Sequence, residues 1–201
     1  MKKSRWKLQD VIMMAVLGVV FAAVYLGIYY AGIALTTALT PIGLSQFGFD
    51  IVYGVWFMGA TIAAYIIRRP GVALVTEVFA SFVELLMGNS GGAVLLLTGL
   101  IQGLGGELGF AVFRYRRYDL VSMSVSGMFS ALCIFLFELY YLQYYTLQLW
   151  LLALLLIVRF ASAILFAGLI SKAACDQVAK TGVLKSYPLG ALQKEIRIRN
   201  D

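Results

Sequence analysis

The stretch EVFASFVELLMGNSGG, from Glu77 to Gly92, is an apolar helical pattern that contains two glutamates and ends in a polar, glycine-rich turn. Glu77 and Glu84 are seven residues apart, so an α-helix places both carboxylates on one face. A charge near the centre of a bilayer costs at least about 2.5 kcal/mol, and such side chains usually face a bundle interior or a cavity. The stretch therefore predicts a membrane helix with an acidic, inward-facing side, followed by a turn.

The composition of the whole chain is that of a membrane protein. Of its 201 residues, 62% are hydrophobic and 13% are charged, with a mean hydropathy of +0.89. Soluble domains are about half apolar and about a quarter charged. We therefore expect an all-α integral membrane protein: a six-transmembrane-helix bundle over residues 1–175, followed by a basic cytoplasmic tail over residues 176–201.

Six apolar runs are candidates for crossing a bilayer, which takes about 17–25 residues. All three prolines fall outside these runs, as helix interiors require. The expected spans are residues 9–35, 50–67, 72–88, 93–113, 121–143 and 147–173.

The basic residues predict an orientation. With a cytoplasmic N-terminus, all but one of the 16 Lys and Arg lie in cytoplasmic segments or at the adjoining helix ends, which is a strong positive-inside pattern. Both termini are therefore expected in the cytoplasm, and the net charge of +6 needs no nucleic acid to explain it. The longer connections then lie outside, which suggests that a ligand is met from the outer face.

Ionisable side chains inside the spans need partners. Arg159, the only cation near the middle of a span, is expected to form a structural ion pair with Glu107 or Glu77. The remaining carboxylates are then protonated, hydrogen-bonded to other helices, or available to a cationic or hydrogen-bond-donating ligand. Glu84, beneath the outer loop and beside Asn89, is the best candidate for a ligand contact.

Amides and aromatic rings in the outer half complete a candidate ligand site. Gln102 lies at mid-depth in an apolar helix, where an amide needs partners, whereas any one ring can equally belong to an aromatic belt at the membrane interface. The candidate ligand-binding residues are Glu84, Glu77, Gln102, Asn89, Gln46, Tyr53, Trp56, Phe47 and Glu138.

Small residues recur at helical spacing in two places. The sequence TGLIQGLGGELG, residues 98–109, has glycines four apart, which lets a helix pack closely against a neighbour. Ala15, Gly18 and Ala22 form a smooth face on the first helix. That face serves either internal packing or docking of another membrane protein.

The sequence argues against an enzyme. GNSG, residues 88–91, matches the GxSG serine motif of rhomboid proteases, but the chain has no histidine to act as the base. It has no Walker A motif for ATP. The two cysteines form no CxxC and indicate neither a metal site nor a disulfide. We expect no cofactor and no metal.

Together these features resemble a known transporter family. The short-looped helices, the basic N-terminus, and EVFASFVELLMGNSGG followed by GLIQGLGGELGF are similar to the YkoE-type substrate-binding (S) component of energy-coupling-factor (ECF) vitamin transporters, associated with thiamine and its hydroxymethylpyrimidine precursor. The similarity covers essentially the whole chain and is strongest from Glu77 to Phe110.

This resemblance implies a division of labour in a bacterial cell membrane. An S component captures the vitamin outside, a transmembrane coupling (T) subunit docks on the small-residue face of the first helix, and two cytoplasmic ATPase subunits power delivery. It also implies Ala15, Gly18 and Ala22 as the docking residues. Other interpretations are an S component for another vitamin such as riboflavin, a standalone proton-coupled carrier, and a membrane scaffold without a ligand.

Overall fold

The structure, a computed structural model, describes residues 6–192, and within them it contains helices and no strand. The α-helices are α1 (Leu8–Leu39), α2 (Phe47–Asp50), α3 (Met58–Ile67), α4 (Val72–Leu86), α5 (Val94–Val112), α6 (Leu120–Tyr141), α7 (Leu149–Ala163) and α8 (Ser171–Lys180). Short helical segments connect them: η1 (Thr40–Ile42), η2 (Tyr53–Phe57), η3 (Tyr144–Thr146) and a π-helical stretch, η4 (Ile164–Ile170). The all-α prediction is confirmed.

Four helical segments are long and apolar enough to cross a membrane, in the part of the chain that the structure describes. They are Leu8–Ile42, Val94–Val112, Leu120–Tyr141 and Leu149–Lys180. The other two expected spans correspond to shorter helices, Tyr53–Ile67 and the 15-residue α4. The expected span at 50–67 is not one continuous α-helix, because α2 ends at Asp50 and the chain resumes as a 3₁₀ turn at Tyr53.

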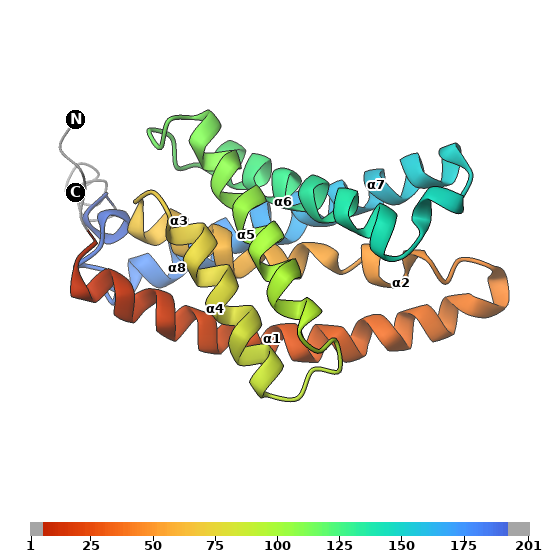
Figure 1. The fold of residues 1–201 in the computed structure, drawn as a ribbon. Helices are drawn as coiled ribbons and strands as arrows, with labels where there is room; N and C mark the ends of the chain where they lie inside the picture. Colours follow the sequence, from red (N-terminus) through yellow and green to blue (C-terminus); the bar gives the residue numbers. More distant parts are fainter. Residues whose placement is uncertain (1–5, 193–201) are drawn as a thin grey trace.

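The helices form a layered bundle around α3. Along its outer layer α1 packs on α4, α4 on α5, α5 on α6, and α6 on α7. Figure 1 shows α1 along one side of this bundle and α6 along the opposite side. Every residue of α3 from Gly59 to Ile67 is buried, as expected of a helix that is apolar on all sides.

Glycines set the close packing of α5 against its neighbours. A Cβ on Gly105 would lie 2.6 Å from Cα of Ser130, and one on Gly109 would also lie under 3.0 Å from Ser126 of α6. Ser126 Oγ in turn donates a 2.7 Å hydrogen bond to the carbonyl of Gly106. The small-residue spacing of residues 98–109 thus serves helix packing inside the chain.

One end of the bundle gathers three segments that are distant in sequence. Trp6 Nε1 donates a 3.0 Å hydrogen bond to the carbonyl of Pro70, and Arg69 forms a 3.2 Å ion pair with Asp10. Tyr187 Oη donates a 2.9 Å hydrogen bond to the carbonyl of Gln9. The start of α1, the α3–α4 turn and the segment after α8 therefore meet there (Figure 1).

The expected tail is packed for much of its length. α8 extends to Lys180, and Leu184 and Leu189 beyond it are 2% and 0% exposed and belong to the main hydrophobic core. Residues 193–201 of that tail, like the basic residues within 1–5, lie outside the described residues.

The expected docking face of α1 is largely internal. Gly18 and Ala22 are buried, and the ring of Phe79 from α4 occupies the space beside Gly18. Among the three residues only Ala15 keeps partial exposure. Gly18 and Ala22 therefore serve the packing of α1 against α4, and docking of a T subunit on this face stays a prediction.

Candidate ligand pocket

A cavity of about 210 Å³ lies beneath the α4–α5 turn. This volume far exceeds the roughly 10–15 Å³ that one water needs. Its wall combines aromatic and polar side chains from eight helical segments and the α4–α5 turn. The lining residues are Tyr29, Phe49, Tyr53, Trp56, Ser81, Glu84, Asn89, Gly91, Leu95, Thr98, Gln102, Glu138, Leu142, Tyr144 and Arg159.

Glu84 presents a free carboxylate oxygen in this wall. Its side chain is 0% exposed, and its Oε1 accepts a 2.7 Å hydrogen bond from Asn89 Nδ2. The Trp56 indole also faces the carboxylate. Oε2, however, is buried with no hydrogen-bond partner among residues 6–192. A buried acceptor of this kind is costly unless something donates to it, so the pocket is prepared for a donor or a cation.

The glycine-rich turn brings Asn89 back onto Glu84. Gly88 and Gly92, which flank it, have φ of 97° and 63°, a backbone conformation that L side chains rarely adopt. The Asn89 Oδ1 atom accepts a 2.8 Å hydrogen bond from the Gly91 N–H, which orients the amide so that its NH₂ faces Glu84. On the outer side of the turn, the Ser90 and Tyr29 hydroxyls are hydrogen-bonded, which connects the turn to α1.

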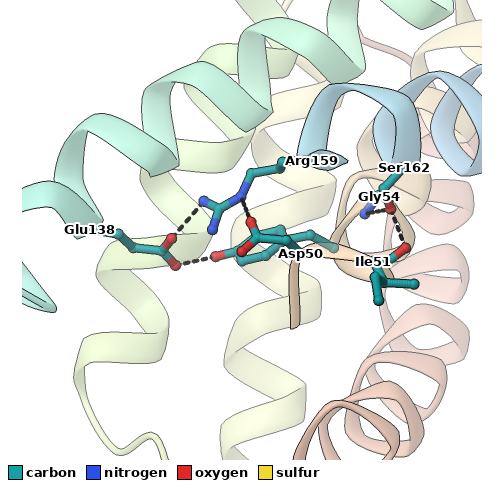
Figure 2. A network of polar contacts seen from close by, with 7 residues as sticks. Asp50, Ile51, Gly54, Glu138, Arg159 and Ser162 are labelled. Carbon is teal, nitrogen blue, oxygen red and sulfur yellow. Dashed lines mark hydrogen bonds and ion pairs between the residues drawn. The ribbon is translucent and has the colours of Figure 1, made fainter. Parts of the chain in front are cut away.

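A buried ionic network forms another part of the wall (Figure 2). The Arg159 guanidinium in α7 bonds to Asp50 Oδ1 through Nε and to Glu138 Oε2 through Nη1. Tyr53 Oη donates a 2.6 Å hydrogen bond to the other oxygen of Glu138, and the guanidinium lies 4.0 Å from the Tyr53 ring centroid. One cation here faces two carboxylates, so the network is acidic overall if all three groups are ionised.

The expected ion pair of Arg159 with Glu107 or Glu77 is therefore wrong. Glu107 instead accepts hydrogen bonds from the backbone N–H groups of Gly71 at 2.6 Å and Ala73 at 3.2 Å, which begin α4. Glu77 accepts a 2.9 Å hydrogen bond from Tyr25 Oη. Both glutamates accept hydrogen bonds from donors on neighbouring helices, whereas Arg159 pairs with carboxylates on α2 and α6.

Comparison with known proteins identifies this architecture. The family described as "ABC-type cobalt transport system, permease component" matches residues 9–133. The chain is 38% identical over 194 residues to "Putative HMP/thiamine permease protein YkoE" of Bacillus subtilis (strain 168), covering 96% of this chain and 95% of the relative. A solved structure described as "Crystal structure of an S-component of ECF transporter" superposes with a TM-score of 0.91 at 38% identity, covering 98% of this chain and 97% of that one. The chain belongs to the YkoE-type S components of ECF transporters. The resemblance inferred from the sequence is confirmed.

Six of the nine candidate ligand residues lie in the pocket wall of this S component. They are Glu84, Asn89, Gln102, Tyr53, Trp56 and Glu138. Gln102 is 5% exposed, and its backbone carbonyl accepts a 2.8 Å hydrogen bond from Ser130 Oγ. Whether these side chains contact a ligand stays a prediction.

Three candidates lie outside the wall. Glu77 is fully buried behind it with Tyr25. Phe47 packs with Phe135 and Leu155 in a separate hydrophobic cluster, and Gln46 is partly exposed before α2. In this short helix Phe49, two residues after Phe47, is the ring that reaches the pocket. These three residues do not line this pocket, and a ligand contact for them stays a prediction.

Sequence reasoning also missed residues of the S component's pocket. Ser81 precedes Glu84 by three residues, and Thr98 precedes Gln102 by four. Helical spacing therefore places Ser81 on the same helix face as Glu84, and Thr98 on the same face as Gln102. That signal was present in the sequence. For Tyr29 in α1 we find no comparable signal, because only the folding of the α4–α5 turn onto α1 brings it to the wall.

The wall as a whole is suited to an aromatic or cationic guest. Its rings come from Tyr29, Phe49, Tyr53, Trp56 and Tyr144, and such rings attract cations and stack on other rings. In the part of the S component that the structure describes, no three His, Cys, Asp or Glu side chains gather as a metal site would require. The chemistry offered is hydrogen-bond acceptance and negative charge beside aromatic faces.

Proposed function

We propose that this S component captures thiamine, or its hydroxymethylpyrimidine precursor, in the pocket beneath the α4–α5 turn. The observation that carries the proposal is Oε2 of Glu84, a residue of the pocket wall: this oxygen is buried with no hydrogen-bond partner among the residues that the structure describes. The name of the Bacillus subtilis relative, an HMP/thiamine permease, supports the same ligand class.

The pocket suits the two rings of thiamine. The aminopyrimidine carries an amino donor and ring-nitrogen acceptors, which Glu84, Asn89 and Gln102 can meet. The thiazolium is a permanent cation, and a cation over Trp56 or a tyrosine ring gains about 0.5–2 kcal/mol. In their ionised forms, Glu84 and the two carboxylates of the Arg159 network would add to the attraction of a cation.

We further propose that capture is one step of an ATP-driven import. The T subunit and two cytoplasmic ATPase subunits of an ECF transporter would supply the energy, because this chain has no Walker A motif. The S component would lie in the bacterial plasma membrane with six spans and cytoplasmic termini, meet its ligand from outside, and use no cofactor. The positive-inside pattern supports this orientation.

Titration in detergent tests the capture step. Thiamine and hydroxymethylpyrimidine are added to the purified protein, and intrinsic tryptophan fluorescence is followed, with riboflavin as a neutral comparison. Glu84→Gln is expected to weaken thiamine binding roughly ten- to hundredfold, because it removes a charge-assisted acceptor. Glu77→Gln is the matched control: an equally buried glutamate on the same helix, outside the wall, whose change should leave the affinity unaltered.

The alternatives predict different results. Binding that Glu84→Gln leaves unchanged would remove Glu84 from the site. Binding of riboflavin but not of thiamine would favour an S component for another vitamin. Uptake into liposomes driven by a pH gradient, without ATPase subunits, would favour a standalone carrier.

A further inference from the structure

The helical backbone is interrupted at Ile51 and Val52, between α2 and η2, and η2 carries two residues of the pocket wall. α2 ends at Asp50 and η2 begins at Tyr53, and both Tyr53 and Trp56 line the pocket. A broken helix leaves backbone groups that the regular helical pattern does not pair. Something else must fix the backbone that carries these two rings.

The Ser162 hydroxyl of α7 supplies that fixation (Figure 2). Its Oγ accepts a 2.9 Å hydrogen bond from the Gly54 N–H and donates a 2.8 Å hydrogen bond to the Ile51 carbonyl. One side chain thus joins the backbone on both sides of the break. Ser162 is 5% exposed and its hydrogen bond with the Gly54 N–H is buried, so removal of the hydroxyl would leave that N–H without its partner.

Gly54 makes this bridge possible. A Cβ at this position would lie under 3.0 Å from the backbone of Ser162 and Ala163. Backbone atoms cannot rotate away as a flexible side chain can, so any side chain here would push the η2 segment off α7. Glycine is needed at this point for close approach.

Arg159 anchors the same segment three residues earlier on α7. Arg159 and Ser162 share one helix face, and the guanidinium bonds Asp50, the residue before the break. Tyr53, just after the break, reaches Glu138 of the same ionic network. One face of α7 therefore contacts the segment at Asp50, Ile51 and Gly54.

We propose that Ser162 and Gly54 are positioning residues of the pocket: they fix the break between α2 and η2 against α7 and thereby place Tyr53 and Trp56 for ligand binding. Neither residue lines the pocket. The link to ligand binding rests on the proposed function; the placement of Trp56 does not depend on it.

The test uses the full chain with Trp6→Phe and Trp150→Phe, so that Trp56 alone emits. In this background Ser162→Ala is compared with Ser126→Ala. Ser126 is also a buried serine whose hydroxyl donates to a backbone carbonyl, but its hydrogen bond joins α6 to α5 and lies away from the pocket wall. The emission maximum of Trp56 and the thiamine affinity are measured, with thermal melting as the measure of folding. Ser162→Thr, which keeps the hydroxyl, is the conservative variant.

We expect Ser162→Ala to shift the Trp56 emission and to weaken thiamine binding at least about fivefold, because a loosely held site loses affinity. Ser126→Ala should lower stability but leave the Trp56 emission and the thiamine affinity unchanged. Ser162→Thr should retain the emission and the affinity of the starting protein. If Ser162→Ala gives no folded protein, Ser162→Cys, with a similar size and a weaker hydrogen-bonding group, takes its place with the same expectations.

Equal Trp56 emission and equal affinity in the Ser162→Ala and Ser126→Ala variants would overturn the positioning role. If the starting protein binds neither thiamine nor hydroxymethylpyrimidine, the proposed ligand is wrong. The Trp56 emission then still decides whether Ser162 positions the segment.

Discussion

Tyr25 of α1 and Glu77 of α4 form a buried pair that stands apart from the pocket. The Tyr25 hydroxyl donates a 2.9 Å hydrogen bond to Glu77 Oε2 and accepts one of 3.0 Å from the Gly59 N–H of α3. Both side chains are 0% exposed. The two glutamates of α4 thus have separate surroundings: Glu77 joins three helices, whereas Glu84 faces the cavity.

Tyr25→Phe should therefore destabilise the protein without a matching loss of ligand affinity. It removes one donor and one acceptor from buried partners, and each unsatisfied buried group costs about 1–3 kcal/mol. Thermal melting in detergent measures the loss, and Tyr30→Phe, at an exposed position of the same helix, is the control. A large loss of thiamine affinity with unchanged melting would instead place Glu77 in the ligand site.

Glu107→Ala should loosen the start of α4. The carboxylate accepts from the N–H groups of Gly71 and Ala73, and removal of such a cap costs about 0.5–2 kcal/mol. Faster amide exchange in the first turn of α4, measured by mass spectrometry, should accompany the lower stability. Glu107→Gln keeps one acceptor oxygen and should show a smaller effect.

A double-mutant cycle separates this capping role from the ion pair expected from the sequence. The effects of Glu107→Ala and Arg159→Met on stability should add to within about 0.5 kcal/mol, because the two side chains share no hydrogen-bond or ion-pair partner among residues 6–192. A coupling energy well above that value would restore the direct pair.

Gly109→Ala should disrupt the contact of α5 with α6. The new Cβ would lie under 3.0 Å from the Ser126 backbone, and overpacking of this kind typically costs about 1–3 kcal/mol. Gly27→Ala in α1 is the matched control, since its Cβ would meet nothing within 4 Å. That control should be neutral or stabilise the helix by up to about 1 kcal/mol, and equal loss in both variants would argue against the close packing.

Asp119→Ala should cost stability in a pH-dependent way. Asp119 precedes α6, where its Oδ1 accepts a 2.9 Å hydrogen bond from the Ser122 N–H. Burial raises the pKa of Asp119, but this hydrogen bond and the Arg117 guanidinium outweigh burial, so the pKa lies below its ordinary value. Folding therefore favours the ionised carboxylate. Its contribution to the free energy of unfolding is fully present above the pKa of Asp119 in the unfolded chain, and it is lost as the pH falls through the lower pKa of the folded protein.

The stability difference between the natural protein and Asp119→Ala should thus be about 1 kcal/mol near neutral pH. It should shrink as the pH falls below about 4, the ordinary pKa of an aspartate. Melting curves at several pH values measure it, and Asp119→Asn, which keeps a capping oxygen, should lose less at neutral pH. A difference that stays constant down to low pH would contradict the role of the charge.

Local patterns in the sequence determined the helical class, the breaks between helices and part of the pocket. Apolar runs and the position of the prolines predicted helices whose ends agree with the structure at the α3–α4 and α4–α5 turns. Helical spacing and depth predicted Glu84, Asn89 and Gln102, which do line one cavity. These features depend on residues a few positions apart, and their periodicity is written in the chain itself.

The tertiary structure alone decided which partner each buried charge receives. Arg159 meets Asp50, 109 residues away, and Glu138, 21 residues away, while Glu107 caps α4 and Glu77 meets Tyr25. It also decided that the smooth face of α1 receives Phe79. Such contacts depend on how each helix is rotated about its axis and how far it is shifted along its neighbour. Both quantities follow from the packing of the whole bundle, and a local sequence pattern does not contain that information.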